Sequence, residues 1–215
     1  VVIPRQGDAF IVTPKFEEER TVEQSHTGPL GNTTQVLTWE EDQSPYRLVA
    51  QGLKAAGLTT GTIGIEETVK YVFVDGIATA NPALRVASAT PVTAGCRMIK
   101  DAHELALMRL ANQVTLKAYE AVYHALRPGM TQDDAGTLIA AAYHQLGFPG
   151  DATVQAGKYS ALPHGSATPQ TILEGTIIMI DDGCQVEEYQ SDITRTFVLG
   201  RATDRMKRVF DIEHA

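Results

Sequence analysis

The clearest hydrophobic pattern in the chain is a helical one that begins at Asp101. Apolar residues recur there at three- and four-residue steps, at Leu105, Met108, Ala111, Ala118, Val122 and Leu126. Asp101 and Glu104 have the spacing of a capping box, and the pattern ends at Arg127-Pro128-Gly129. A second helix is predicted from Thr131 to near Gly147. This part of the chain is therefore expected to be a helical pair.

Residues 1 to 95 alternate short strand-like and helical pieces. Two β-rich runs within residues 1 to 17, split by the turn RQGD, predict a hairpin. An amphipathic helix is predicted between Ser44 and Gly57. The run YVFVDG at 71 to 76 fits either a strand or the end of a helix. Since the pattern changes near residue 96, we predict two domains, 1–96 and 97–215.

Beyond residue 150 the two-residue period of β-strands takes over. In TIIMIDDG (176–183) Asp181 lies on one face of the predicted strand and Asp182 on the other. In SDITRTFVLG (191–200) Asp192 shares a face with Thr194. Pairing these strands as a hairpin places Asp181 opposite Asp192, with Cβ atoms about 5 Å apart.

Two carboxylates this close repel each other, and one takes up a proton unless a cation lies between them. A divalent metal ion, or two ions bridged by the pair, would relieve the repulsion. The spacing of two aspartates alone, however, favours solvated or capping carboxylates beside a turn.

Composition excludes several classes of protein. The 215 residues carry 26 acidic and 18 basic side chains, a net charge of −8, with no clustered basic surface for nucleic acid. No apolar run approaches the roughly 18 residues of a membrane helix, and no signal peptide is evident. We expect a soluble, cytoplasmic protein without membrane association. Cys96 and Cys184 each stand alone, which predicts two buried small hydrophobic residues rather than a disulfide or thiolate site.

Three motifs in order supply further context. They are Pro163-His164-Gly165, Ile180-Asp181-Asp182-Gly183 and YQSDITRTF at 189–197. This order resembles the catalytic core of the creatinase/prolidase/aminopeptidase P family, the pita-bread metallopeptidases. The upstream stretches GCRMIKDAHELALMRLANQVTLKAYEAV and LRPGMTQDD are similar to that family's first catalytic-domain helices, and IGIEE to its N-terminal domain.

The resemblance implies a mixed α/β (α+β) fold. Residues 1–96 would form a creatinase/prolidase-like N-terminal domain, incomplete at its start. Residues 97–215 would form the first half of a pita-bread metallopeptidase domain with an antiparallel sheet.

The resemblance also implies roles for three residues. Asp181 and Asp192 would bind two divalent metal ions, Mn²⁺ foremost, with Co²⁺ or Zn²⁺ as alternatives. The D-x-G pattern selects Asp181 over Asp182. His164 matches a histidine that hydrogen-bonds the substrate and stabilises the tetrahedral intermediate. The remaining histidines are expected to be structural or on the surface: His26, His103, His124, His144 and His214.

The chain departs from the family pattern in two respects. The family completes its metal site with a histidine and two glutamates well downstream, whereas this chain ends at residue 215. Glu213 and His214 fall in a predicted helix and fit no ligand motif. We therefore expect a fragment, inactive alone, that lacks the second half of the catalytic domain. The second departure is Glu187-Glu188, since relatives commonly carry glycine beside the following tyrosine.

Three functions follow as hypotheses. The first is a metal-dependent exopeptidase that cleaves Xaa-Pro bonds, of aminopeptidase P or prolidase type. The second is a creatinase-like hydrolase of a small amide or amidine, without metal, and the third is a non-catalytic binding or assembly module. Retention of both aspartates favours the first.

The expected partners are a proline-containing peptide, a second copy in a homodimer, and the missing C-terminal half. The sheet would otherwise expose a large apolar patch at residues such as Ile177, Met179 and Phe197.

Overall fold

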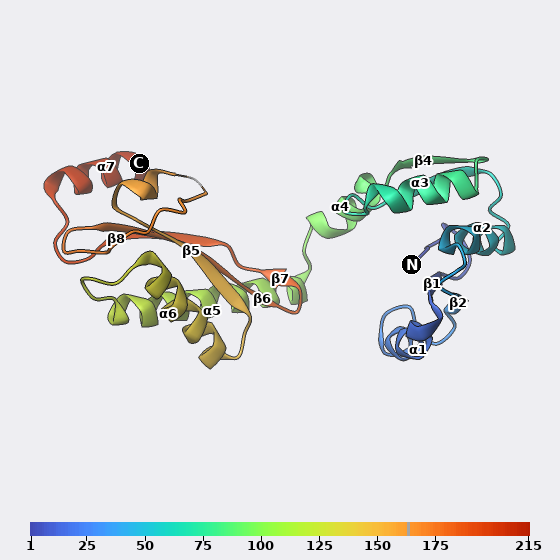
Figure 1. Cartoon of the computed structure of the whole chain (residues 1–215), viewed down its shortest axis with the longest axis horizontal. Helices are drawn as coiled ribbons and strands as arrows, with labels where there is room; N and C mark the ends of the chain where they lie inside the picture. The colour runs from blue at the N-terminus through green and yellow to red at the C-terminus, as the bar shows by residue number, and fades with distance from the viewer. Residues whose placement is uncertain (163) are drawn as a thin grey trace. The chain divides into compact units, whose positions relative to one another are not determined.

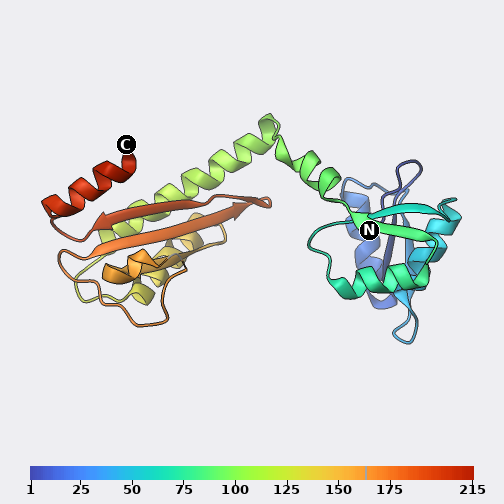
Figure 2. The ribbon, with the colours of Figure 1, turned by 90° about the horizontal axis from the view of Figure 1, so that it is seen from above.

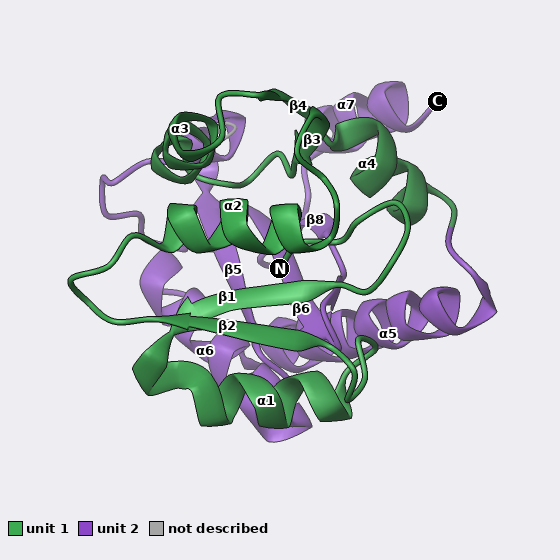
Figure 3. Cartoon of the chain, turned by 90° about the vertical axis from the view of Figure 1, so that its right-hand side faces the viewer, with its two compact units in different colours: residues 1–99 green, residues 100–215 purple. Residues whose placement is uncertain are grey.

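The computed structural model describes residues 1–162 and 164–215. Pro163, the first residue of the histidine motif, lies outside the described residues. The chain forms two compact units, residues 1–99 and 100–215 (Figure 3). Parallel strands with helices in the first unit and helices with an antiparallel sheet in the second confirm the predicted mixed α/β class.

The first unit contains two pairs of parallel strands in its described residues. Strand β1 (Phe10–Pro14) pairs with β2 (Gln35–Trp39), and β3 (Gly61–Ile65) pairs with β4 (Leu84–Ser88). The helical segments of this unit are η1 (Lys15–Glu17), α1 (Glu18–Thr27), α2 (Pro45–Ala55), α3 (Tyr71–Ala80) and α4 (Thr90–Met98). A small core of Phe10, Val49 and Leu53 joins α2 to β1. This core contains none of the predicted site residues.

The structure corrects one prediction in this unit, decides one open alternative and confirms one helix. The hairpin predicted for residues 1–17 is reduced to one antiparallel bridge between Val2 and Phe10, because β1 pairs in parallel with β2. The run at 71–76 is the first part of helix α3. The helix predicted after Ser44 is confirmed as α2, which follows Ser44 directly.

The second unit begins with the predicted helical pair, and both helices are confirmed. Helix α5 (Ala102–Ala125) starts at a capping box of Asp101 and Glu104. Helix α6 (Gln132–Leu146) starts at a capping box centred on Thr131 and ends at Gly147, which has a left-handed backbone conformation. The later elements are β5 (Gly150–Ala156), η2 (Gly157–Ala161), β6 (Ile177–Val186), β7 (Tyr189–Gln190), β8 (Ile193–Val198) and α7 (Asp204–His214).

Strand β6 lies at the centre of the antiparallel sheet, with β5 on one side and β7 and β8 on the other. Helices α5 and α6 cover one face of this sheet, and η2 lies over the other (Figures 1 and 2). Even-numbered side chains of β6 are buried on the helix face: Ile178, Ile180, Asp182, Cys184 and Val186. Odd-numbered side chains point to the other face.

Two sequence predictions about apolar residues need correction. Cys184 is buried as predicted, but Cys96 is exposed on α4. Ile177 and Met179 are half-buried rather than exposed. Phe197 is wrongly assigned to their face, because it pairs with Ile178 on the helix face and contacts the Tyr123 ring edge-on at 5.8 Å.

The described residues include no helix that is both long and apolar enough to cross a lipid bilayer.

Candidate metal site on the antiparallel sheet

Asp181 is exposed on the sheet face away from α5 and α6, as the strand alternation predicts. Its direct partner across the ladder is Thr194 on β8, and the Thr194 hydroxyl donates a 2.6 Å hydrogen bond to Asp181 Oδ1. The predicted direct opposition of Asp181 and Asp192 is therefore wrong. A charge-neutral hydroxyl, rather than a second carboxylate, lies directly across from Asp181.

The hairpin turn explains this register. Val186 pairs with Tyr189 across a two-residue loop, and the same register continues to the pair of Asp181 with Thr194. Continued past Ile193, it places Gly183 opposite Asp192. This register makes Asp181 and Asp192 diagonal neighbours, which are typically about 7–8 Å apart, with their Cβ atoms somewhat closer. This offset leaves space between the carboxylates and avoids the repulsion that direct opposition would impose.

Gly183 has a steric role in bringing Asp192 to the sheet. A Cβ atom added at Gly183 would lie 2.3 Å from the carbonyl oxygen of Ser191, too close for any side chain. The glycine of the D-x-G motif thus lets the backbone before Asp192 approach β6 closely.

A cavity of about 320 Å³ joins these residues. Asp181, Gly183 and Asp192 line it together with Asp151 of β5, which pairs with Gly183. The sequence alternation gave no reason to single out Asp151, since its position beside the site depends on the β5–β6 register. Asp181 and Asp192 are thus brought to one cavity, whose lining also includes Asp151 and Asp182.

Asp182 lies on the opposite face, as its strand position predicts. It is only 4% exposed, and the Tyr143 hydroxyl donates a 2.6 Å hydrogen bond to its Oδ1. Its Oδ2 has no hydrogen-bond partner among the described residues. Burial raises the pKa of Asp182 to about 6, while the Tyr143 hydrogen bond opposes the shift. Its side chain lies on the helix face of β6, opposite to the side chain of Asp181, although Asp182 is also among the residues that line the cavity.

His164 lies in an exposed turn and does not line the cavity of Asp181 and Asp192. The turn continues into Gly165, whose φ is 76° and whose backbone lies close to Gln155, since an added Cβ would lie 2.1 Å from Gln155 Nε2. Gln155 is buried and accepts a 3.0 Å hydrogen bond from Gln170. The catalytic role of His164 stays a prediction.

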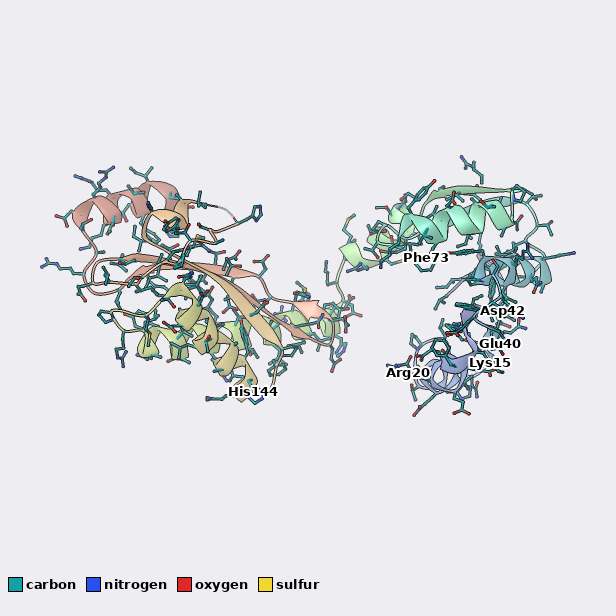
Figure 4. The ribbon with its side chains drawn as sticks, in the orientation of Figure 1. Lys15, Arg20, Glu40, Asp42, Phe73 and His144 are labelled. Atoms are coloured by element: carbon teal, nitrogen blue, oxygen red, sulfur yellow. The ribbon has the colours of Figure 1, made fainter. Side chains whose placement is uncertain are left out.

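The other five histidines are all exposed. Figure 4 marks one of them, His144, near the end of α6. Glu213 and His214 are exposed on α7, where the His214 ring stacks on Phe210.

The donor set suits a hard divalent cation. Two carboxylates supply the oxygen ligands that Mn²⁺ accepts readily, whereas Zn²⁺ more often takes imidazole or thiolate. Within residues 1–162 and 164–215, no group of three or more His, Cys, Asp and Glu side chains is placed to hold a metal ion. Asp181 and Asp192 therefore fit a metal site as part of its ligand set.

Several dipeptidases are similar to this chain over nearly its whole length. The Xaa-Pro dipeptidase of Pyrococcus furiosus is 28% identical over 214 residues, which cover 98% of this chain and 57% of that protein. The crystal structure of dipeptidase PepE from Mycobacterium ulcerans is 27% identical with a TM-score of 0.82, over 97% of this chain and 55% of that one.

The prolidase of Thermococcus sibiricus, at 21% identity, shares the fold with a TM-score of 0.83, over 97% of this chain and 56% of that one. The chain thus spans about half the length of the relatives it matches.

Two family models divide the chain between them. The creatinase/prolidase N-terminal domain matches residues 1–99, and metallopeptidase family M24 matches residues 106–215, which include Asp181, Asp192 and His164. This chain therefore belongs to metallopeptidase family M24, with a creatinase/prolidase N-terminal domain ahead of its peptidase segment.

Proposed function

We propose that the protein is a metal-dependent exopeptidase that hydrolyses the bond between an N-terminal residue and proline. The observation that carries the proposal is that Asp181 and Asp192 line one cavity. The Xaa-Pro dipeptidase of Pyrococcus furiosus supports the choice of substrate.

Asp181 and Asp192 would hold two divalent ions, Mn²⁺ foremost, with Co²⁺ or Zn²⁺ as alternatives. Such ions lower the pKa of a bound water and polarise the scissile carbonyl group. The Thr194 hydroxyl restricts the Asp181 carboxylate to one orientation. His164 would donate a hydrogen bond to the carbonyl oxygen of the substrate and stabilise the charge that develops on it.

Two carboxylates are too few to fix two ions, so further ligands must complete the site. We propose that they come from polypeptide beyond these 215 residues, as the family pattern implies, and that the working protein is a homodimer. The alternative of a metal-free hydrolase of small amides is less well supported, because that reaction assigns no role to the two aspartates that line the cavity.

The test is a metal-dependence assay on the protein as it is encoded. Chelator-treated protein receives Mn²⁺, Co²⁺ or Zn²⁺ in turn, with an Xaa-Pro dipeptide, an Xaa-Pro-Xaa tripeptide or creatine as substrate. We expect metal-dependent release of the N-terminal residue from a proline peptide, and none from the matched Xaa-Ala peptide. Turnover of creatine without metal would favour the amidine hydrolase, and no turnover of any substrate would favour a binding module.

A further inference from the structure

A chain of buried hydrogen bonds runs behind the two carboxylates, on the helix face of the sheet. Asp182 Oδ1 lies 2.6 Å from Tyr143 Oη, which lies 3.0 Å from Thr115 Oγ1. Thr115 Oγ1 lies 2.7 Å from Ser191 Oγ, and Ser191 Oγ accepts a 2.9 Å hydrogen bond from the Cys184 backbone N–H. All five residues are buried. The chain connects β6, the segment after β7, and helices α5 and α6.

The Tyr143 hydroxyl is the donor at two contacts of this chain. Tyr143 has a single hydroxyl proton, and an ionised carboxylate is its stronger acceptor. Tyr143 Oη is also placed to donate to Thr115 Oγ1, and either Thr115 or Ser191 can donate across the 2.7 Å contact between them. Each hydroxyl contacts the next one in the chain, so the positions of Tyr143, Thr115 and Ser191 depend on one another. Removal of one hydroxyl therefore disturbs the whole chain.

The two ends of the chain are the sequence neighbours of the proposed ligands. Asp182 follows Asp181, and Ser191 precedes Asp192. Since successive strand side chains point to opposite faces, a fixed Asp182 also fixes the direction of the Asp181 side chain. Ser191 fixes the entry of the chain into Asp192 in the same way. Helices α5 and α6 thus hold the neighbours of both carboxylates from the opposite face of the sheet.

Tyr119 adds a second connection at the same place. Its hydroxyl oxygen lies 2.6 Å from the carbonyl oxygens of both Ile180 and Ile193. These are the residues directly before Asp181 and directly after Asp192. Tyr119 and Thr115 are one helical turn apart on α5 and so contact the sheet from the same side.

We propose that Thr115 and Tyr143 are positioning residues for metal binding at Asp181 and Asp192, an inference that rests on the proposed function. They touch neither the metal ion nor the substrate. Their hydroxyls hold the two ligand-bearing segments in a fixed relation before the ion binds, which lowers the cost of ordering the carboxylates. Apolar residues of equal volume could fill the same space but could not set this orientation.

The test measures Mn²⁺ affinity by calorimetric titration of the metal-stripped protein as it is encoded, so no turnover is needed. Thr115→Val keeps the shape and removes the hydroxyl, and we expect Mn²⁺ to bind at least about 10-fold more weakly. Thr115→Ser restores the hydroxyl and should return the affinity to near the wild-type value. Ile139→Val is the matched control, since it thins the same core away from the network and should lower Tm without changing Kd.

The outcomes separate two possible failures. If the wild-type protein binds Mn²⁺ and Thr115→Val binds it with the same Kd, the positioning role is overturned and the proposed function stands. No binding of Mn²⁺ by the wild-type protein would overturn both. If Thr115→Val does not fold, Tyr143→Phe gives the same reading, because it also removes one hydroxyl from the chain. An equal loss of affinity in Ile139→Val would also overturn the inference, since general loosening of the core would then explain the effect.

Discussion

Thr194 lies directly opposite Asp181 in the β6–β8 ladder, and its hydroxyl donates a 2.6 Å hydrogen bond to Asp181 Oδ1. A carboxylate that accepts one bond at one oxygen is restricted in rotation and keeps its other lone pairs available. Hydrogen bonds of this kind orient the side chains that bind metal ions. Thr194 is therefore part of the candidate site although it is not itself proposed as a ligand.

Thr194→Val should weaken Mn²⁺ binding about 10- to 100-fold, because Asp181 loses the hydroxyl that orients it. Thr194→Ser should bind nearly as the wild type does. Thr196→Val is the matched control on the same strand and face, opposite Met179 rather than an aspartate. Equal weakening in Thr194→Val and Thr196→Val would show that the strand surface, not the hydrogen bond, controls affinity.

Asp192→Asn and His164→Ala should have different effects. Asp192 lines the cavity of Asp181, so a neutral amide there should remove metal binding and peptidase activity together. His164 lies in an exposed turn outside that cavity, so His164→Ala should retain metal and lower kcat by about 10²-fold or more. Measurements of the metal content and kcat of both variants test these two expectations. Equal metal loss in the two would make His164 a ligand.

Local signals predicted most of the second unit. The capping boxes at Asp101 and Thr131 begin both helices, because each side chain satisfies a free backbone N–H within its own turn. The two-residue period separated Asp181 from Asp182 correctly. Counted from Asp192, the same period places Phe197 on the helix face, so the pattern itself agrees with the structure at Phe197 and does not support grouping it with Ile177 and Met179.

Contacts between distant segments could not be predicted in this way. The register that puts Thr194 opposite Asp181 depends on a two-residue loop that the sequence did not reveal, since Glu187-Glu188 is an unusual pair for it. Thr115 and Ser191 are far apart in sequence and meet only after α5 packs on the sheet. The position of Asp151 beside the cavity depends in the same way on the pairing of β5 with β6.

Replacement of Glu187-Glu188 by Asn-Gly should stabilise the protein. The φ angles of Glu187 and Glu188 are 45° and 69°, in the left-handed region that side chains with a Cβ disfavour. Asn-Gly suits a two-residue hairpin loop with both φ angles positive, so we expect a gain of about 1 kcal/mol in the free energy of unfolding. Urea denaturation measures it.

The control for this turn is the double variant Glu187→Gln, Glu188→Gln. It removes the two adjacent charges and leaves the backbone conformation as it is. If backbone strain is the cause, this variant should gain much less than Asn-Gly. An equal gain in both variants would assign the effect to charge repulsion.

Asp182 should make the wild-type protein less stable as pH rises through the range from about 4 to about 6. Burial raises the pKa of Asp182 from 3.8 to about 6 in the folded protein, so between these values the folded state binds more protons than the unfolded state. Stability therefore falls with pH, by an amount on the order of 3 kcal/mol for two pKa units.

Asp182→Asn cannot ionise and should lack this contribution, while its amide oxygen can still accept the Tyr143 hydrogen bond. Urea denaturation of both metal-free proteins between pH 4 and pH 7 gives the difference in free energy of unfolding, in which most other titrating groups cancel. The wild type should lose stability relative to Asp182→Asn across that range and level off above it. A difference that stays constant, or that rises with pH, would mean that Asp182 is ionised in the folded protein throughout and that its buried surroundings accommodate the charge.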